Sequence, residues 1–133
     1  MKTIISSHSN LAYGLKDTLI FMGTDITNAE FIVLDEKGVN DFEEKVRKTL
    51  DSVKNEEILI FVDIFGGTPY NTFAKEILSR KLNAEMISGF NVSMIIQALS
   101  ADSITEMLDD FAEDNGIKIY SKELLKLYNS DDE

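Results

Sequence analysis

The chain has 133 residues, 44% of them hydrophobic, and a formal net charge of −11 at pH 7. This length and composition predict one globular domain over residues 1–133, with an acidic tail at 128–133, and exclude a disordered chain. The acidic balance argues against nucleic acids and anionic membranes as partners, because both require a basic patch. Two interpretations of the charge stay open: it gives solubility, or it complements a basic protein partner.

The counts of cysteine and histidine narrow the chemistry further. The chain has no cysteine and a single histidine, His8, which excludes disulfides, cysteine nucleophiles and zinc sites built from two histidines of this chain. No apolar run approaches the roughly 20 residues of a membrane span, and the first residues lack the pattern of a signal peptide. We therefore expect a cytoplasmic protein that holds no metal and is not inserted into a membrane.

The chain begins with a strand pattern followed by a helix pattern. Residues 2–7 predict a strand that ends beside His8. A helix from about residue 9 or 10 to Met22 follows, capped by Ser9 or Asn10. The apolar face of this helix is expected to contain Leu11, Leu15, Leu19 and Met22.

The next segment repeats the alternation. A second strand is predicted at residues 29–35, and a helix opened by Asn40 follows it, with Glu43 in the position of a capping box. The inner stripe of that helix is expected to contain Phe42, Val46, Leu50 and Val53. Residues 57–64 form a nearly continuous apolar run, as in a central strand that is buried on both faces, and Asp63 lies near its carboxyl end.

The sequence FGGTP at residues 65–69 then turns the chain into a third helix. Thr68 is its expected cap, and Pro69 is expected at the first helical position. The inner face of this helix is expected to contain Phe73, Ala74, Ile77 and Leu78. Residues 84–88 predict a fourth strand, and Asn91 is the expected cap of the helix that follows.

The C-terminal part predicts shorter elements. Ser103 begins the capping-box pattern of a helix that ends before Gly116. Residues 117–120 predict a short fifth strand, and Ser121 is the expected cap of a last helix around residues 123–128.

This alternation predicts an α/β fold: a three-layer α/β/α sandwich around a mainly parallel sheet, with the strand order 2-1-3-4 and the short fifth strand at the edge. In such a sheet the first and third strands are neighbours, and a crevice opens at their carboxyl ends. His8 and Asp63 both fall there. A carboxylate beside an imidazole fixes the proton on Nδ1 and leaves Nε2 as a nucleophile or base.

Three predicted helix starts lie at the same edge of the sheet and offer free backbone N–H groups to an anion. They follow Ser9 or Asn10, Thr68 and Asn91. Gly66 and Gly67 either allow a close approach of the backbone to a ligand or only turn the chain. The sequence has no P-loop motif and no GxGxxG motif after a strand, which disfavours a nucleotide cofactor.

A nucleophilic imidazole within an anion site predicts phosphorylation of His8 itself. Asp63 fits less well as the phosphorylated group, because a Mg²⁺-dependent aspartyl phosphate would need further carboxylates at the end of the first strand. Ser6 and Ser7 stand there instead.

Three motifs resemble the IIA domain of the mannose family of the bacterial sugar phosphotransferase system (PTS), and the resemblance covers nearly the whole chain. They are SSHS at residues 6–9, VDIFGGTPYN at 62–71 and GFN at 89–91. The resemblance implies a phosphotransferase in which His8 accepts a phosphoryl group on Nε2 from the phosphocarrier HPr and passes it to the IIB component. It implies that Asp63 orients the ring, and it implies no cofactor.

The same resemblance implies that the turn at residues 66–68 and Asn91 line the phosphate pocket, with Thr68 helping to hold the phosphate. It also implies that the strand at 117–120 is antiparallel and is exchanged between the two subunits of a homodimer. Many family members have glycine directly after the histidine, whereas this chain has Ser9. That side chain would cap the helix, hydrogen-bond the phosphate or narrow the approach of a partner.

Other functions stay open. One is a regulatory module whose phosphorylation controls another protein, and another is the phosphoryl-transfer subunit of a dihydroxyacetone kinase system. A flavodoxin-like flavin binder is a third hypothesis, which rests on fold analogy and on the hydroxyl-rich loop SSHSN at residues 6–10.

Overall fold

The computed structural model describes residues 1–108 and 117–131. Within these ranges five strands form one sheet in the order β2-β1-β3-β4-β5. The strands are β1 (Lys2–His8), β2 (Ala29–Leu34), β3 (Ile58–Val62), β4 (Ala84–Ser88) and β5 (Lys118–Ile119). The first four strands are parallel to one another, and β5 pairs antiparallel with β4. The predicted sheet order and the antiparallel edge strand are therefore confirmed.

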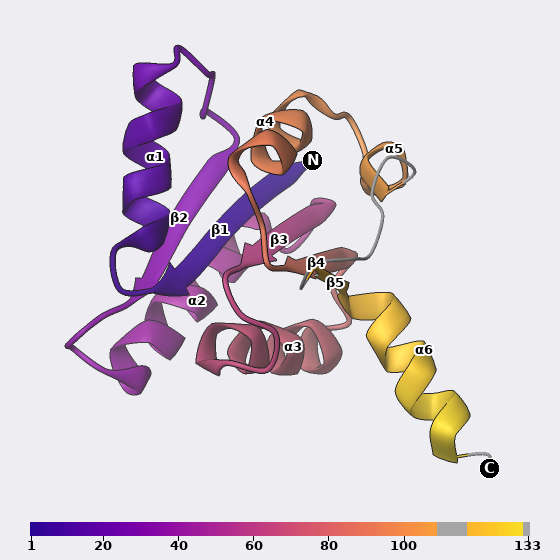
Figure 1. Cartoon of the computed structure of the whole chain (residues 1–133). Coiled ribbons are helices and arrows are strands. Elements are labelled where there is room, and N and C mark those ends of the chain that lie inside the picture. Colours follow the sequence, from indigo (N-terminus) through magenta and orange to yellow (C-terminus); the bar gives the residue numbers. More distant parts are fainter. Residues whose placement is uncertain (109–116, 132–133) are drawn as a thin grey trace.

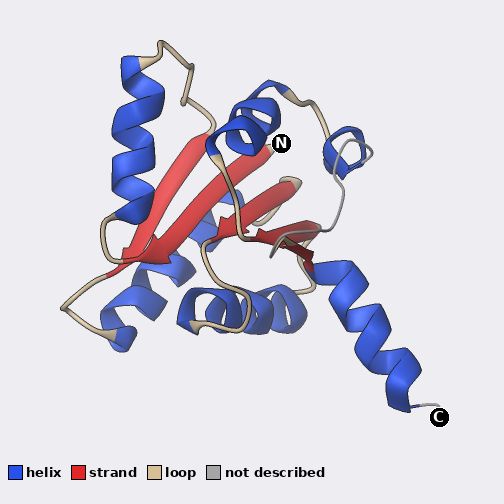
Figure 2. Ribbon diagram, viewed as in Figure 1, coloured by secondary structure: helices blue, strands red, loops and turns tan. Residues whose placement is uncertain are grey.

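Helices cover both faces of the sheet (Figure 1). They are α1 (Leu11–Phe21), α2 (Val39–Val53), α3 (Thr68–Arg80), α4 (Val92–Ser100), α5 (Ile104–Leu108) and α6 (Tyr120–Asp131). The core side chains of α2 and α3 pack together on one face, and those of α1, α4 and α5 pack on the other. Figure 2 shows the strands between these two helical layers, which is the predicted three-layer sandwich.

Strand β3 lies at the centre of the sheet, and all five of its residues are fully buried. Ile58, Ile60 and Val62 belong to the core that α2 and α3 cover, whereas Leu59 and Phe61 belong to the opposite core. This alternation is the two-residue period of a strand with apolar layers on both sides. Burying one such side chain contributes about 1.5–3 kcal/mol, so the central strand is fixed tightly in register.

The predicted inner faces are correct for α2 and partly wrong for α1 and α3. Phe42, Val46, Leu50 and Val53 of α2 are all buried, as expected. Leu11 of α1, its C-cap Met22 and Leu78 of α3 are instead 57%, 54% and 61% exposed. The buried stripe of α1 consists of Ala12, Leu15 and Leu19, and the core residues of α3 include Phe73 and Ile77.

The predicted cap of α2 is wrong by two residues. Gly38, not Asn40, is the N-cap, and no side chain caps the helix. Gly38 has φ 92°, a conformation that favours glycine, and its N–H donates to Asp35 O at 3.0 Å. Because of this turn, the helix begins two residues earlier than the side-chain pattern predicts.

The last helix also begins differently from its prediction. Tyr120 is already helical, and Ser121 donates its N–H to Oε1 of the buried Glu85 at 3.0 Å instead of capping the helix. The helix extends away from the sandwich (Figure 1) and continues to Asp131, into the stretch expected as a tail. In this structure β5 pairs with β4 of the same chain, so its exchange between subunits stays a prediction.

The helix start predicted at Ser103 is confirmed, because the Ser103 hydroxyl accepts the N–H of Glu106 at 3.2 Å. Helix α5 is described to Leu108. The predicted end before Gly116 lies outside the described residues. None of the helices in the described ranges has the length and apolar character needed to cross a bilayer.

Candidate functional site

The sheet brings His8 and Asp63 into direct contact. His8 is the last residue of β1, and Asp63 follows the last residue of β3, whose Val62 is in register with Ser6. Oδ2 of Asp63 lies 3.0 Å from the ring Nδ1 of His8 and accepts the backbone N–H of the same residue at 3.0 Å. The pairing that the strand ends predict is therefore present, and one carboxylate oxygen holds both the ring and its backbone.

The two partners differ in exposure. The Asp63 side chain is 8% exposed, whereas the His8 side chain is 41% exposed. The second oxygen of Asp63, Oδ1, is buried and has no hydrogen-bond partner among the described residues. The contact between Nδ1 and Oδ2 is a hydrogen bond when the ring proton is on Nδ1, so the carboxylate favours that tautomer. The remaining ring nitrogen, Nε2, is then the group available for chemistry.

The two glycines of the β3–α3 loop serve different purposes. Gly66 has φ 80°, a conformation that L side chains rarely adopt, and a Cβ there would meet no atom within 4 Å. Gly67 has ordinary extended dihedral angles, φ −75° and ψ 175°. A Cβ on Gly67 would lie 2.9 Å from Cε1 of His8. Gly66 therefore turns the chain, and the close approach at Gly67 is made by the imidazole itself.

Thr68 lies at this helix start but not in the predicted position. The N-cap of α3 is Gly67, and Thr68 and Pro69 are the first two helical residues. Proline is tolerated there because the first-turn N–H groups have no partner within the helix. With no capping side chain on Gly67, the N-terminus of α3 keeps backbone donors free beside His8.

The loop from β1 to α1 is fastened by Ser7, a residue that the sequence interpretation did not single out. Its buried hydroxyl accepts the N–H of Ala12 at 2.8 Å and donates to Ser9 O at 3.2 Å. The N-cap position is occupied by Asn10, whose side chain makes no capping bond. The predicted N-cap position is therefore confirmed for Asn10, but a capping hydrogen bond from its side chain is absent. The only feature of the sequence that points to this role of Ser7 is the run of hydroxyl residues before the helix.

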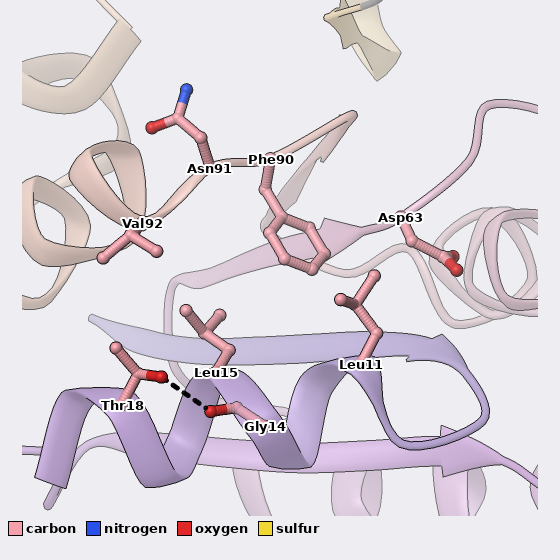
Figure 3. A pocket seen from close by; sticks show the side chains of 8 residues that line it. All are labelled: Leu11, Gly14, Leu15, Thr18, Asp63, Phe90, Asn91 and Val92. Carbon is pink, nitrogen blue, oxygen red and sulfur yellow. Dashed lines mark hydrogen bonds between the residues drawn. The ribbon is translucent and has the colours of Figure 1, made fainter. Parts of the chain in front are cut away.

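Asn91 is confirmed as the cap of α4, because its Oδ1 accepts the N–H of Met94 at 3.0 Å. It lies on the rim of a cavity of about 510 Å³ between α1 and the start of α4, which is mostly apolar. The lining residues are Leu11, Gly14, Leu15, Thr18, Asp63, Phe90, Asn91 and Val92 (Figure 3). Phe90 lies between Asn91 and Asp63 in this view.

Tyr70, in the first turn of α3, packs against the loop between β3 and α3. Its ring packs against Phe65, with centroids 4.9 Å apart, and against Tyr120 at the start of α6, with centroids 6.2 Å apart. Burial, helped by the neighbouring Tyr120 and acidic groups, raises the pKa of Tyr70 to about 12. The phenol is therefore neutral at pH 7 and adds no charge to the site. In the described part of the chain, no three His, Asp or Glu side chains are grouped to hold a metal ion.

Comparison with known protein families assigns the chain to one of them. A family model described as "PTS system fructose IIA component" (EIIA-man) matches residues 2–114. The chain belongs to this family. It is therefore an EIIA component of the phosphotransferase system, as the three motifs suggested.

Two curated relatives of this EIIA component are similar over most of its length. The PTS system fructose-specific EIIA component of Bacillus subtilis (strain 168) is 31% identical over 103 residues, which cover 75% of this chain and 69% of the relative. The PTS system sorbose-specific EIIA component of Lacticaseibacillus casei is 26% identical over 107 residues, covering 79% of this chain and 77% of the relative.

Solved structures support the fold of this EIIA component. The phosphotransferase system component EIIA from Streptococcus agalactiae superposes with a TM-score of 0.72 at 24% identity, covering 81% of this chain and 86% of that one. The mannose/sorbose specific IIA subunit from Enterococcus faecalis gives a TM-score of 0.71 at 22% identity, covering 80% and 82%.

The backbone of Ser9 leads to a prediction about stability. Ser9 has φ 52° and donates its N–H to Leu34 O at 2.7 Å, so a left-handed conformation is imposed on a residue with a side chain. The substitution Ser9→Gly should raise the free energy of unfolding by about 0.5–1 kcal/mol, because glycine adopts this conformation without steric cost. Urea denaturation measures the change.

The neighbouring Asn10 provides the control for this measurement. Asn10 has φ −85° and its side chain makes no capping bond, so Asn10→Gly relieves no strain and should lower stability slightly. If Ser9→Gly destabilised the protein as Asn10→Gly does, the side chain of Ser9 would be making a compensating interaction, and the assignment of strain would be wrong.

Proposed function

We propose that this EIIA component carries a phosphoryl group on Nε2 of His8, accepting it from HPr and passing it to the IIB component of a sugar transport system. One observation carries the proposal: Nδ1 of the ring is 3.0 Å from the buried carboxylate of Asp63, while the His8 side chain is 41% exposed. The ring is thus held at one nitrogen and accessible to another protein.

The geometry supports a direct exchange between two histidines. The lone pair of Nε2 attacks the phosphorus atom of the phosphohistidine on HPr, a new N–P bond forms, and the N–P bond of the donor breaks with its electron pair returning to the donor ring. The proton stays on Nδ1 of His8, where Asp63 stabilises the positive charge that develops on the ring. Transfer to IIB reverses these roles.

The start of α3 provides the donors for the phosphoryl oxygens. No side chain caps this helix, so its first-turn amides, beginning with Thr68, are free to bind an anion. The Thr68 hydroxyl and the amide of Asn91 complete the proposed pocket. Ser9, exposed directly after the histidine, would add a hydroxyl group.

The surface around His8 suits docking of a protein rather than of a sugar. Ile64 and Phe65, which follow Asp63, are 55% and 45% exposed, and Leu11 on the other side of the site is 57% exposed. Such apolar side chains around a reactive group are typical of protein interfaces. HPr and IIB would cover them in turn, in the cytoplasm where this relay operates.

A homodimer is part of the same proposal. Helix α6 extends away from the sandwich (Figure 1) and exposes Leu125, Leu127 and Tyr128, which are 59%, 64% and 69% accessible. A second copy would bury this apolar side, together with the edge of the sheet at β5.

The first prediction concerns the phosphorylated residue. After incubation with phosphoenolpyruvate, Enzyme I and HPr, the protein should carry a phosphate that is labile in acid and stable in base, as expected for phosphohistidine. Mass spectrometry should place it on His8. His8→Ala should abolish the label, because no other histidine is present. A label that persists in this variant would contradict the assignment of the site.

The second prediction concerns Asp63. Asp63→Asn should keep the fold but slow phosphoryl transfer roughly 100-fold or more, because a neutral amide cannot stabilise the charged ring and can favour the wrong tautomer. Quench-flow measurement of transfer from labelled HPr gives the rate.

A matched control for this variant is Asp35→Asn. Asp35 follows β2 at the same edge of the sheet, where its Oδ1 accepts the N–H of Lys37 at 3.0 Å, a bond that asparagine can also make. Its transfer rate should equal that of the wild type. Equal rates for Asp63→Asn and Asp35→Asn would remove Asp63 from the mechanism.

A further inference from the structure

Gly67 stands where any side chain would collide with the reactive ring. A Cβ at this position would lie 2.9 Å from Cε1 and 3.5 Å from Nε2 of His8, and 3.6 Å from Ile64 O. The shortest of these separations is below those that Cβ atoms make in proteins. The imidazole therefore packs directly on the bare backbone of residue 67.

The backbone itself does not require glycine at this position. Gly67 has φ −75° and ψ 175°, which every L residue adopts without strain. The adjacent Gly66 is the opposite case, because its φ is 80° and a Cβ there would meet nothing within 4 Å. The requirement for glycine at 67 thus comes from the ring of His8, not from the turn.

We propose that Gly67 is a positioning residue for His8. Its lack of a side chain lets the ring lie between the carboxylate of Asp63 and the N-cap of α3, so that contact with the N-cap opposes a rotation that would break the Nδ1–Asp63 bond. The same contact holds Nε2 3.5 Å from the Cβ position of residue 67, at the helix end whose first-turn N–H groups have no capping side chain. The consequence for phosphoryl transfer rests on the function proposed above.

An alanine at position 67 would force the ring to move. Its methyl group would displace Cε1 and tilt Nδ1 away from Asp63. Alanine is also a poorer N-cap residue than glycine, a cost that does not depend on the ring. The ring should then populate both tautomers, and transfer from HPr should fall roughly 10- to 100-fold, the loss expected when a reacting atom is misplaced by a fraction of an ångström to one ångström.

The ring can be observed without any transfer assay, because His8 is the only histidine. In ¹⁵N-labelled protein at alkaline pH, the imidazole spectrum should contain one protonated Nδ1 and one unprotonated Nε2. In Gly67→Ala the two ¹⁵N shifts should move toward each other, as in Asp63→Asn. Gly14→Ala is the matched control, because a Cβ at Gly14 meets nothing within 4 Å, and its spectrum should equal that of the wild type.

A stability cycle tests the contact independently. Gly67→Ala should lower the urea midpoint more in the wild-type background than in the His8→Ala background, where no ring is present to collide with the methyl group and only the poorer N-cap remains. An unchanged imidazole spectrum in Gly67→Ala, or an equal loss of stability in both backgrounds, would overturn the proposal. Failure of the wild-type protein to accept phosphate would overturn the relay instead, and would leave both of these readouts unaffected.

Discussion

The site depends on one buried carboxylate that is compensated mainly by a single residue. Asp63 is 8% exposed, and its Oδ2 meets both the backbone N–H and the ring Nδ1 of His8. Such a group is costly to bury unless it is paired, so the carboxylate and the imidazole stabilise each other's positions. The parallel pairing of β1 with β3 makes the contact possible, because it places the two strand ends at the same edge of the sheet.

The backbone on each side of this pair departs from regular structure. Ser9 and Gly66, which follow closely after His8 and Asp63, both have positive φ angles, 52° and 80°. Unusual conformations of this kind collect at functional sites, where the surrounding structure imposes them. Here they turn the chain sharply after each strand, so that α1 and α3 leave on opposite faces and the ring stays open at the rim.

The sequence alone correctly predicts the elements in which apolar residues recur with a regular period. The buried stripe of α2, the central position of β3 and the meeting of His8 with Asp63 all follow from periods and from topology. The errors concern details that depend on tertiary contacts or on single dihedral angles. The positive φ of Gly38 moved the start of α2, and the carboxylate of Glu85, distant in sequence, holds the start of α6. The contact of Gly67 with the ring has no sequence signature beyond the glycine itself.

The central claim is that Asp63 accepts a hydrogen bond from Nδ1 of His8 and thereby leaves Nε2 as the nitrogen that is phosphorylated. The most direct test is the ¹⁵N spectrum of the phosphorylated ring, which distinguishes the two phosphohistidine isomers, and the single histidine makes the assignment unambiguous. The account predicts that the phosphorus atom is bonded to Nε2, with Nδ1 still protonated. A phosphoryl group found on Nδ1 would contradict it, because that nitrogen lies against the buried carboxylate.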